Sequence, residues 1–196
     1  NKFNEELVKI NHDGNILNDD EHPRKGLKIC DLEKLKTVFQ DNGTITPGNS
    51  SGINDGAAAL LLTSLAETEK KSIKPLAKIV SWSSVGVDPS VMGLGPIEAI
   101  RRACKKAKWD LDEIDLFEIN EAFASQSIAV IRELGIDQNK VNVNGGAIAL
   151  GHPIGASGAR ILVTLIHEMK RQNKNKGCAT LCIGGGMGIA LCVERV

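Results

Sequence analysis

The chain has 196 residues, with 24 Lys plus Arg and 24 Asp plus Glu, so its formal net charge is zero. A neutral chain lacks the basic excess that favours nucleic-acid binding, and we expect no such partner. No apolar run in the sequence reaches the ~18 residues of a membrane-spanning helix, which argues against a membrane protein. Hydrophobic residues make up 42% of the chain, an ordinary share for a globular protein.

The cysteines do not form a recognisable scaffold. There are five: Cys30, Cys104, Cys178, Cys182 and Cys192. Their number is odd, and their spacing fits neither a disulfide framework nor a zinc site. We therefore expect free thiols in a reducing compartment, and place the chain in the cytoplasm. A mitochondrial location stays open, because the chain begins with Asn1 rather than Met.

The first 54 residues are polar and rich in turn-forming residues. Stretches such as NHDGN and NDDEHPRKG are typical of loops, and we expect one helix among them, over 31–39. A loop-rich stretch of this length usually serves binding.

The segment 56–64 reads GAAALLLTS and is apolar over most of its length. Such a run fits a strand buried on both faces or a helix, and periodicity does not decide between them. A helix is expected over 65–72, before Pro75. Residues 76–88 alternate in polarity, as a strand does.

Helices and strands alternate in the rest of the chain. Pro96, at a first-turn position, is expected to open a helix with an apolar stripe. A strand over 115–119 leads directly into a helix over 121–134. A short strand over 141–144 is followed by a helix beginning near Ser157, which is a suitable N-cap residue.

The last segment, 178–196, reads as two apolar strands joined by a glycine turn, which predicts an antiparallel pair. The order of all these elements predicts an α/β layered fold with a mixed sheet. In such folds ligands bind beyond the strand ends. Asn120, His152 and Cys182 all lie at or just past predicted strand ends, so we expect them to belong to one site.

His152 lies in the glycine-rich stretch GGAIALGHPIGASGAR, residues 145–160. A single histidine is more often structural than catalytic, but little side-chain bulk surrounds this one, so it can face a cleft. The N-terminus of the following helix disfavours the imidazolium and keeps the ring neutral near pH 7. A neutral ring can accept a proton or donate a hydrogen bond to a developing oxyanion.

Cys182 and Asn120 each have a structural alternative. Cys182 is either a small buried hydrophobe, as most free cysteines are, or a reactive thiol served by the N–H groups of the glycine run 184–186. The sequence favours neither. Asn120 could simply cap the helix that follows it, or it could hold a water or a carbonyl oxygen.

Several common motifs are missing. GLGPIEA, residues 93–99, lacks the third glycine of a dinucleotide-binding loop, and GASGAR, residues 155–160, lacks the lysine of a P-loop. A metal site made by His152 with Cys178 and Cys182 is not expected, because no C-x-x-C or H-x-x-x-H pair is present.

Taken together, the motifs resemble the thiolase family. NEAFA at 120–124, GGAIALGHPIGASGAR at 145–160 and CIGGGMGIA at 182–190 look like its three signature blocks. GNSSGINDGAAA at 48–59 and IVSWSSVGVDPSVMGLGP at 79–96 are similar to further blocks, closest to the acetoacetyl-CoA thiolase branch. The resemblance covers nearly the whole chain, in order.

The resemblance implies an acyltransferase that joins two acetyl-CoA molecules into acetoacetyl-CoA, or runs the reverse thiolysis. Coenzyme A is then part of the substrate, and no permanently bound cofactor is implied. By motif match, Cys182 removes a proton from the incoming acetyl group. His152 activates the acylated cysteine and helps bind a thioester oxygen, Asn120 positions a water in that oxyanion hole, and the N–H of Gly184 helps form a second one.

The resemblance also implies substrate contacts. Phe123 would line the pantetheine tunnel. Ser51 would meet pantetheine, and Arg24 would lie near the nucleotide end of coenzyme A. At Met92 the sequence is similar to that of the short-chain branch of the family.

One departure from the family is large, because thiolases carry the acylated cysteine in an N-terminal half that this chain lacks. We expect a fragment, a processed piece or one subunit of a split enzyme, and a homo-oligomer once complete. The implied layout is 1–54 as the end of the loop domain, 55–75 as the last strand and helix of the first half, and 76–196 as the C-terminal thiolase domain with a five-stranded mixed sheet. The alternative is a non-catalytic, truncated chain that binds coenzyme A or a partner.

Overall fold

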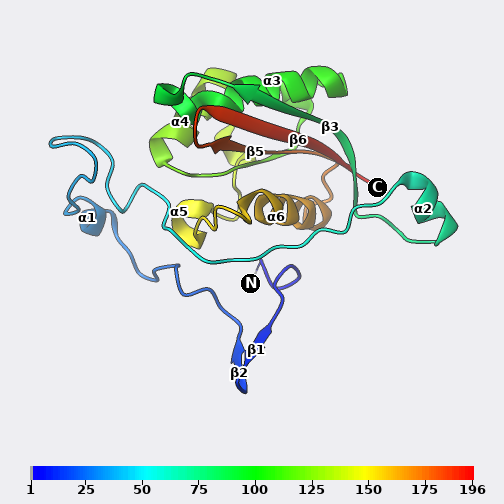
Figure 1. Cartoon of the computed structure of the whole chain (residues 1–196), viewed down its shortest axis with the longest axis horizontal. Helices are drawn as coiled ribbons and strands as arrows, with labels where there is room; N and C mark the ends of the chain where they lie inside the picture. Colours follow the sequence, from blue (N-terminus) through cyan, green and yellow to red (C-terminus); the bar gives the residue numbers. More distant parts are fainter. Residues whose placement is uncertain (1) are drawn as a thin grey trace.

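A computed structural model describes residues 2–196 (Figure 1). The strands are β1 (Ile10–His12), β2 (Asn15–Leu17), β3 (Ala77–Gly86), β4 (Leu116–Ile119), β5 (Lys176–Ile183) and β6 (Met187–Arg195). The α-helices are α1 (Ile29–Leu32), α2 (Leu65–Lys70), α3 (Gly95–Ala107), α4 (Ala124–Leu134), α5 (Ala147–Leu150) and α6 (Ser157–Arg171). Short 3-10 helices are η1 (Pro89–Leu94), η2 (Leu111–Glu113) and η3 (Gln138–Lys140).

The main sheet has four strands in the order β3-β6-β5-β4. Strands β5 and β6 form the predicted antiparallel hairpin, with Cys182 opposite Gly188. Strand β3 adds to β6 antiparallel, and β4 adds to β5 in parallel. The predicted mixed sheet and its closing hairpin are therefore confirmed.

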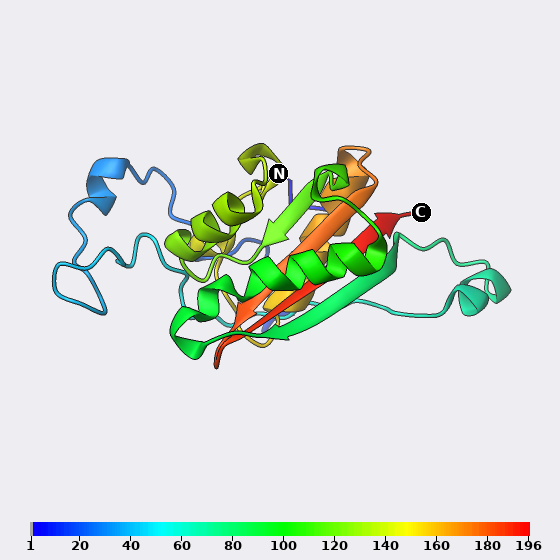
Figure 2. The ribbon, with the colours of Figure 1, turned by 90° about the horizontal axis from the view of Figure 1, so that it is seen from above.

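Helices cover both faces of this sheet. Figure 1 shows α3 and α4 on one face and α6 on the other, and Figure 2 shows α3 lying across the first face with α4 beside it. Alternate residues of each strand serve the two layers, as the period of two requires. Phe117 and Cys178 are buried with α3 and α4, whereas their neighbours Leu116 and Ala179 are buried with α6.

The strand predicted over 141–144 is reduced to isolated bridges. Val141 pairs in parallel with Phe117, which places this segment at the β4 edge where a fifth strand would lie. The backbone then leaves the extended region at Asn142, whose φ is 45°. The Asn142 side chain bonds the main chain of Ile119 in place of a fifth strand. Its Oδ1 accepts from the N–H of Ile119 and its Nδ2 donates to the Ile119 carbonyl, both at 2.8 Å.

Two elements expected in the first 75 residues are not formed as expected in the described chain. Residues 56–64 form neither a strand nor a helix, and Leu61 is 89% exposed. A strand needs a neighbouring strand to satisfy its N–H and C=O groups, and none lies beside this segment within the described residues. The helix expected over 31–39 is only the short α1, since an isolated helix of that length is marginal without packing.

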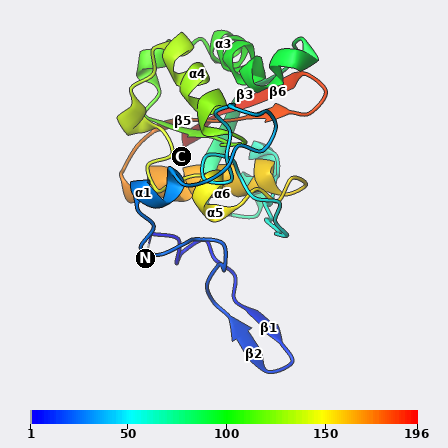
Figure 3. The ribbon, with the colours of Figure 1, turned by 90° about the vertical axis from the view of Figure 1, so that its left-hand side faces the viewer.

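The N-terminal segments reach out from the layered core. Figure 3 shows the β1–β2 hairpin projecting away from it. Closer in, the Thr164 hydroxyl on α6 donates to the Glu6 carboxylate at 3.0 Å. Residues 49–54 lie along the segments that follow β4 and α5, with bridges from Ser50 to Phe123 and from Ile53 to His152.

Candidate active site

Asn120 comes directly after β4 and continues its pairing with β5. Its N–H donates to the carbonyl of Thr180 at 3.0 Å, and the residue is only 1% exposed. Helix α4 begins later, at Ala124, with Phe123 as its N-cap. Asn120 therefore does not cap the helix, and that alternative is wrong.

His152 is held by its main chain against the loop that precedes α2. Its N–H donates to Oδ1 of Asn54 at 3.0 Å, and it forms a parallel bridge with Ile53. The residue before it, Gly151, has a φ of 106°. A Cβ at Gly151 would lie 2.8 Å from Cγ of Asn54, so glycine is needed there both for conformation and for space.

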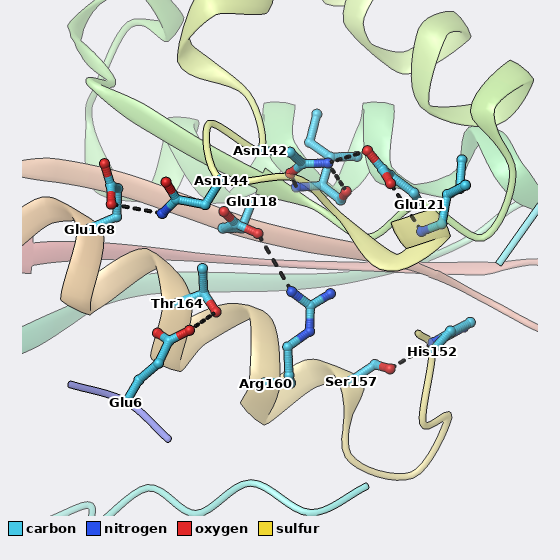
Figure 4. A network of polar contacts seen from close by, with 12 residues as sticks. Glu6, Glu118, Glu121, Asn142, Asn144, His152, Ser157, Arg160, Thr164 and Glu168 are labelled. Atoms are coloured by element: carbon cyan, nitrogen blue, oxygen red, sulfur yellow. Dashed lines mark hydrogen bonds and ion pairs between the residues drawn. The ribbon is translucent and has the colours of Figure 1, made fainter. Parts of the chain in front are cut away.

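Both ring nitrogens of His152 have polar neighbours. Nδ1 lies 2.6 Å from Oγ of Ser157, a contact shown in Figure 4. Nε2 lies 3.4 Å from Nδ2 of Asn120. The structure thus brings Asn120 and His152 together, as the strand-end argument predicted. Ser157 is not the N-cap of α6, because that position belongs to Ala156.

The environment of His152 favours the neutral ring. Burial is the main cause that lowers the pKa of His152, and the positive charge of Arg160 lowers it further. The sequence predicts a neutral ring from the nearby helix N-terminus, and in the structure burial and Arg160 favour that same form.

Cys182 lies in β5, two residues after Thr180, and is 8% exposed. Burial raises the pKa of its thiol, and its own main-chain group opposes that shift. A thiolate base needs a lowered pKa, so the described chain does not by itself provide that environment. The role of Cys182 stays a prediction.

Gly184 lies in the turn between β5 and β6 and is exposed. The two glycines after it, Gly185 and Gly186, have φ values of 88° and 87°, which residues with a Cβ rarely adopt. No atom lies within 4 Å of the position that a Cβ would take at Gly184. The oxyanion contact of its N–H group stays a prediction.

The loop residue Ser51 is tied to the turn before α4. Its N–H and its hydroxyl both donate to the Ala122 carbonyl, at 3.0 and 3.2 Å. Next to it, Ser50 bridges to Phe123, and the ring of Phe39 meets that of Phe123 edge-on at 6.0 Å. The N-terminal loops are thus packed against the turn that follows β4.

Two of the predicted substrate-binding residues, Met92 and Phe123, share a groove. Its volume is about 360 Å³. Its other lining residues are Ser90, Val91, Gly93, Leu94, Ser125, Gln126 and Ala129. Arg24 is not brought to this groove. It is exposed, and no hydrogen bond or ion pair joins it to the residues from 2 to 196.

The sequence predicts no role for Glu118 of β4 or Arg160 of α6, which form an ion pair. Glu118 is 2% exposed, and its carboxylate lies 3.9 Å from the Arg160 guanidinium, as Figure 4 shows. Burial raises the pKa of Glu118 to about 8, and Arg160 opposes the shift. Glu118 lies in the stretch DLFEI, which the sequence predicts only as a strand, so nothing in the sequence indicates a functional role for its carboxylate.

Glu121 fastens the loop that leads to His152. Its carboxylate accepts from Nδ2 of Asn142 and from the N–H of Ile148, both at 3.1 Å. Asn142 and α5, which leads to His152, are therefore linked through one half-buried carboxylate. The sequence signal for Glu121 is its position directly after Asn120.

No three His, Cys, Asp or Glu side chains of the described chain are grouped so that they could hold a metal ion. None of the described helices combines the length and the apolar character needed to cross a bilayer.

Comparison with family models matches residues 73–195 to the thiolase C-terminal domain and residues 1–66 to the thiolase N-terminal domain. Among relatives, a cytosolic acetyl-CoA acetyltransferase of Mus musculus is 58% identical over 178 residues, 90% of this chain and 45% of its own. An acetyl-CoA acetyltransferase of Shinella zoogloeoides is 56% identical over 199 residues, 100% of this chain and 51% of its own.

Solved structures agree with this. The Bacillus anthracis acetyl-CoA acetyltransferase superposes with a TM-score of 0.96 at 48% identity, covering 100% of this chain and 50% of its own. Human mitochondrial 3-ketoacyl-CoA thiolase in complex with CoA superposes with a TM-score of 0.93 at 42% identity, covering 100% and 49%. The chain thus spans about half the length of the proteins it matches. On these grounds the chain belongs to the thiolase family.

Proposed function

We propose that this chain is the part of an acetyl-CoA C-acetyltransferase that supplies the proton-transfer and oxyanion groups, and that it works with a complementary thiolase half carrying the acylated cysteine. The observation that supports this most is the contact between Asn120 and His152, which unites two of the motifs. The names of the relatives supply the substrate class, acetyl-CoA and acetoacetyl-CoA.

In the proposed reaction, Nε2 of His152 takes the thiol proton of the partner half's cysteine. That sulfur attacks the thioester carbon of the first acetyl-CoA. The departing coenzyme A sulfur takes its proton from the thiol of Cys182, so Cys182 becomes a thiolate and His152 keeps the proton on Nε2. His152, and a water held by Asn120, face the thioester oxygen of the second acetyl-CoA. General acid–base help of this kind typically contributes ~10²–10⁴-fold in rate.

Cys182 then removes a proton from the methyl group of the second acetyl-CoA. The enolate carbon attacks the acetyl carbonyl, forms the new C–C bond and releases the sulfur of the partner's cysteine, which takes back its proton from Nε2 of His152. A donor fixed in advance at the Gly184 N–H would stabilise the oxyanion of the acyl-enzyme during this step. Met92 and Phe123 would bound the acyl and pantetheine path, with Ser51 and Arg24 on coenzyme A.

The need for a complementary half has its own support. Residues 56–64 are apolar but do not pair, and Leu61 and Leu62 are 89% and 68% exposed. An exposed apolar patch of this kind marks an interaction site. We propose that this segment becomes the last strand of the first thiolase half, in the layout 1–54, 55–75 and 76–196, and that the completed enzyme is a homo-oligomer. The cytosol is the proposed compartment, as in the name of the mouse relative.

A reconstitution assay tests the proposal. Acetoacetyl-CoA cleavage, followed as loss of its enolate absorbance, is measured for the chain alone, for the complementary half alone and for both. Activity only with both halves supports the proposal. Coenzyme A binding without activity in any combination supports the alternative, a non-catalytic binding chain.

A further inference from the structure

The hydroxyl group of Ser157 lies between the ring of His152 and a main-chain carbonyl. Ser157 is fully buried, at 0% exposed. Its Oγ lies 2.6 Å from Nδ1 of His152 and donates to the carbonyl of Pro153 at 2.9 Å. Both contacts join the first residue of α6 to the loop before it, and the buried hydroxyl does not face solvent.

Counting protons at this group fixes the form of the ring. A serine hydroxyl has one proton to donate and lone pairs to accept with. If its proton goes to the Pro153 carbonyl, the hydroxyl must accept at the ring, and Nδ1 of His152 must then carry the hydrogen.

The other side of the ring agrees with this. The neighbour of Nε2 is the Nδ2 amide group of Asn120, at 3.4 Å, and an amide NH₂ can only donate. Nε2 must then be the unprotonated, accepting nitrogen. Two independent neighbours thus select one neutral tautomer.

We propose that Ser157 is a positioning residue, which keeps the proton of His152 on Nδ1 and leaves Nε2 bare and directed at Asn120. The use of that bare nitrogen as a base rests on the proposed function, but the tautomer does not. Asn54 holds the main chain of the same histidine. The backbone and the ring are therefore fixed by separate groups, which limits the loss of conformational freedom during the reaction.

The surrounding charge is consistent with a neutral ring. Arg160 lies one turn further along α6 than Ser157, and its positive charge disfavours a second proton on the ring. A carboxylate in place of the serine hydroxyl would have favoured the imidazolium instead. When Nε2 accepts the thiol proton, Nδ1–H stays bonded to Ser157, so the ring keeps its orientation.

The test is NMR of the full chain labelled with ¹⁵N-histidine, without substrate. The His152 signals are identified by their loss in His152→Gln. A protonated and an unprotonated imidazole nitrogen differ strongly in ¹⁵N shift. The proposal predicts a protonated Nδ1 and a bare Nε2 in the unmodified chain, and a change in that distribution in Ser157→Ala.

Matched variants complete the design. Ser157→Thr retains a hydroxyl and should restore the original pattern, whereas Ser64→Ala, which removes an exposed hydroxyl at the N-cap of α2, should leave it unchanged. A bare Nδ1 in the unmodified chain, or an unaltered pattern in Ser157→Ala, overturns the proposal. The spectrum of the unmodified chain is decisive even if a variant does not fold. Because no turnover is measured, failure of the reconstitution assay would not affect this result.

Discussion

The carboxamide nitrogen of Asn120 lies 3.4 Å from Nε2 of His152, although 32 positions separate the two residues in the sequence. The end of β4 fixes the first, and the loop between α5 and α6 fixes the second. The end of β4 and the loop before α6 meet because α6 packs on one face of the sheet, against the paired strands β4 and β5. Two motifs that are distant in sequence thus become one polar site.

Replacing Asn120 should impair catalysis in the reconstituted enzyme. Removing one donor of an oxyanion hole typically costs ~10²–10³-fold in rate, so we expect Asn120→Ala to lower kcat by about that factor. The measurement is the steady-state rate of acetoacetyl-CoA cleavage. Asn139→Ala, which removes an exposed amide on η3, is the control and should retain normal activity. An unchanged kcat in Asn120→Ala would exclude the proposed role.

Replacing Cys182 should separate the two stages of the reaction. In the reconstituted enzyme, Cys182→Ser is expected to abolish condensation, because the base that removes the methyl proton is lost. Acylation of the partner half's cysteine should persist, and intact mass after incubation with acetyl-CoA measures it. Cys30→Ser is the matched control, since Cys30 is exposed and lies far along the chain in α1. Normal condensation by Cys182→Ser would contradict the assignment.

Stability should depend on pH through Glu118. Its pKa is raised from 4.5 to about 8, so the folded chain binds a proton that the unfolded chain has already released. The free energy of unfolding should therefore fall as pH rises from about 4.5 to about 8. One such proton corresponds to a slope of ~1.4 kcal/mol per pH unit.

Urea unfolding at several pH values measures this slope. Glu118→Gln cannot ionise and should flatten the dependence. Glu69→Gln removes an exposed carboxylate on α2 and serves as the control. An identical slope for Glu118→Gln and the unmodified chain would show that another group is responsible.

A methyl group at Gly151 should destabilise the loop that carries His152. This glycine has φ 106° and ψ 160°, a conformation that is essentially restricted to glycine. We expect Gly151→Ala to lower the free energy of unfolding by roughly 1–3 kcal/mol. In Gly155→Ala, by contrast, the added Cβ would meet no atom within 4 Å. Equal effects of the two substitutions on unfolding would argue against the strained geometry.

Most of the layered core could be predicted from the sequence. The hairpin of β5 and β6 is predicted from two apolar runs joined by a glycine turn, and α3 from an apolar stripe that follows Pro96. Both appear at these positions, as do α6 and β4. Periodicity reports which face of an element is buried, and in this part of the chain each element finds its layer. The partners of the segment 56–64 are not encoded locally, which is why its apolar character left strand and helix open and the described chain forms neither.

The site was only partly predictable for a similar reason. Asn120 and His152 were found because each follows a strand or lies in a glycine-rich loop. Ser157 was interpreted as a helix cap, because the sequence does not show that its hydroxyl turns back to the ring. Glu118 and Arg160 meet only through tertiary packing, so no spacing rule indicated their contact.

The most direct test of the central claim is a crystal structure of the chain combined with the complementary half and acetyl-CoA. The account predicts that the thioester oxygen lies within hydrogen-bond distance of Nε2 of His152, with the Cys182 sulfur next to the acetyl methyl group. A thioester bound away from both side chains, with the ring and the sulfur opening onto separate cavities, would contradict it.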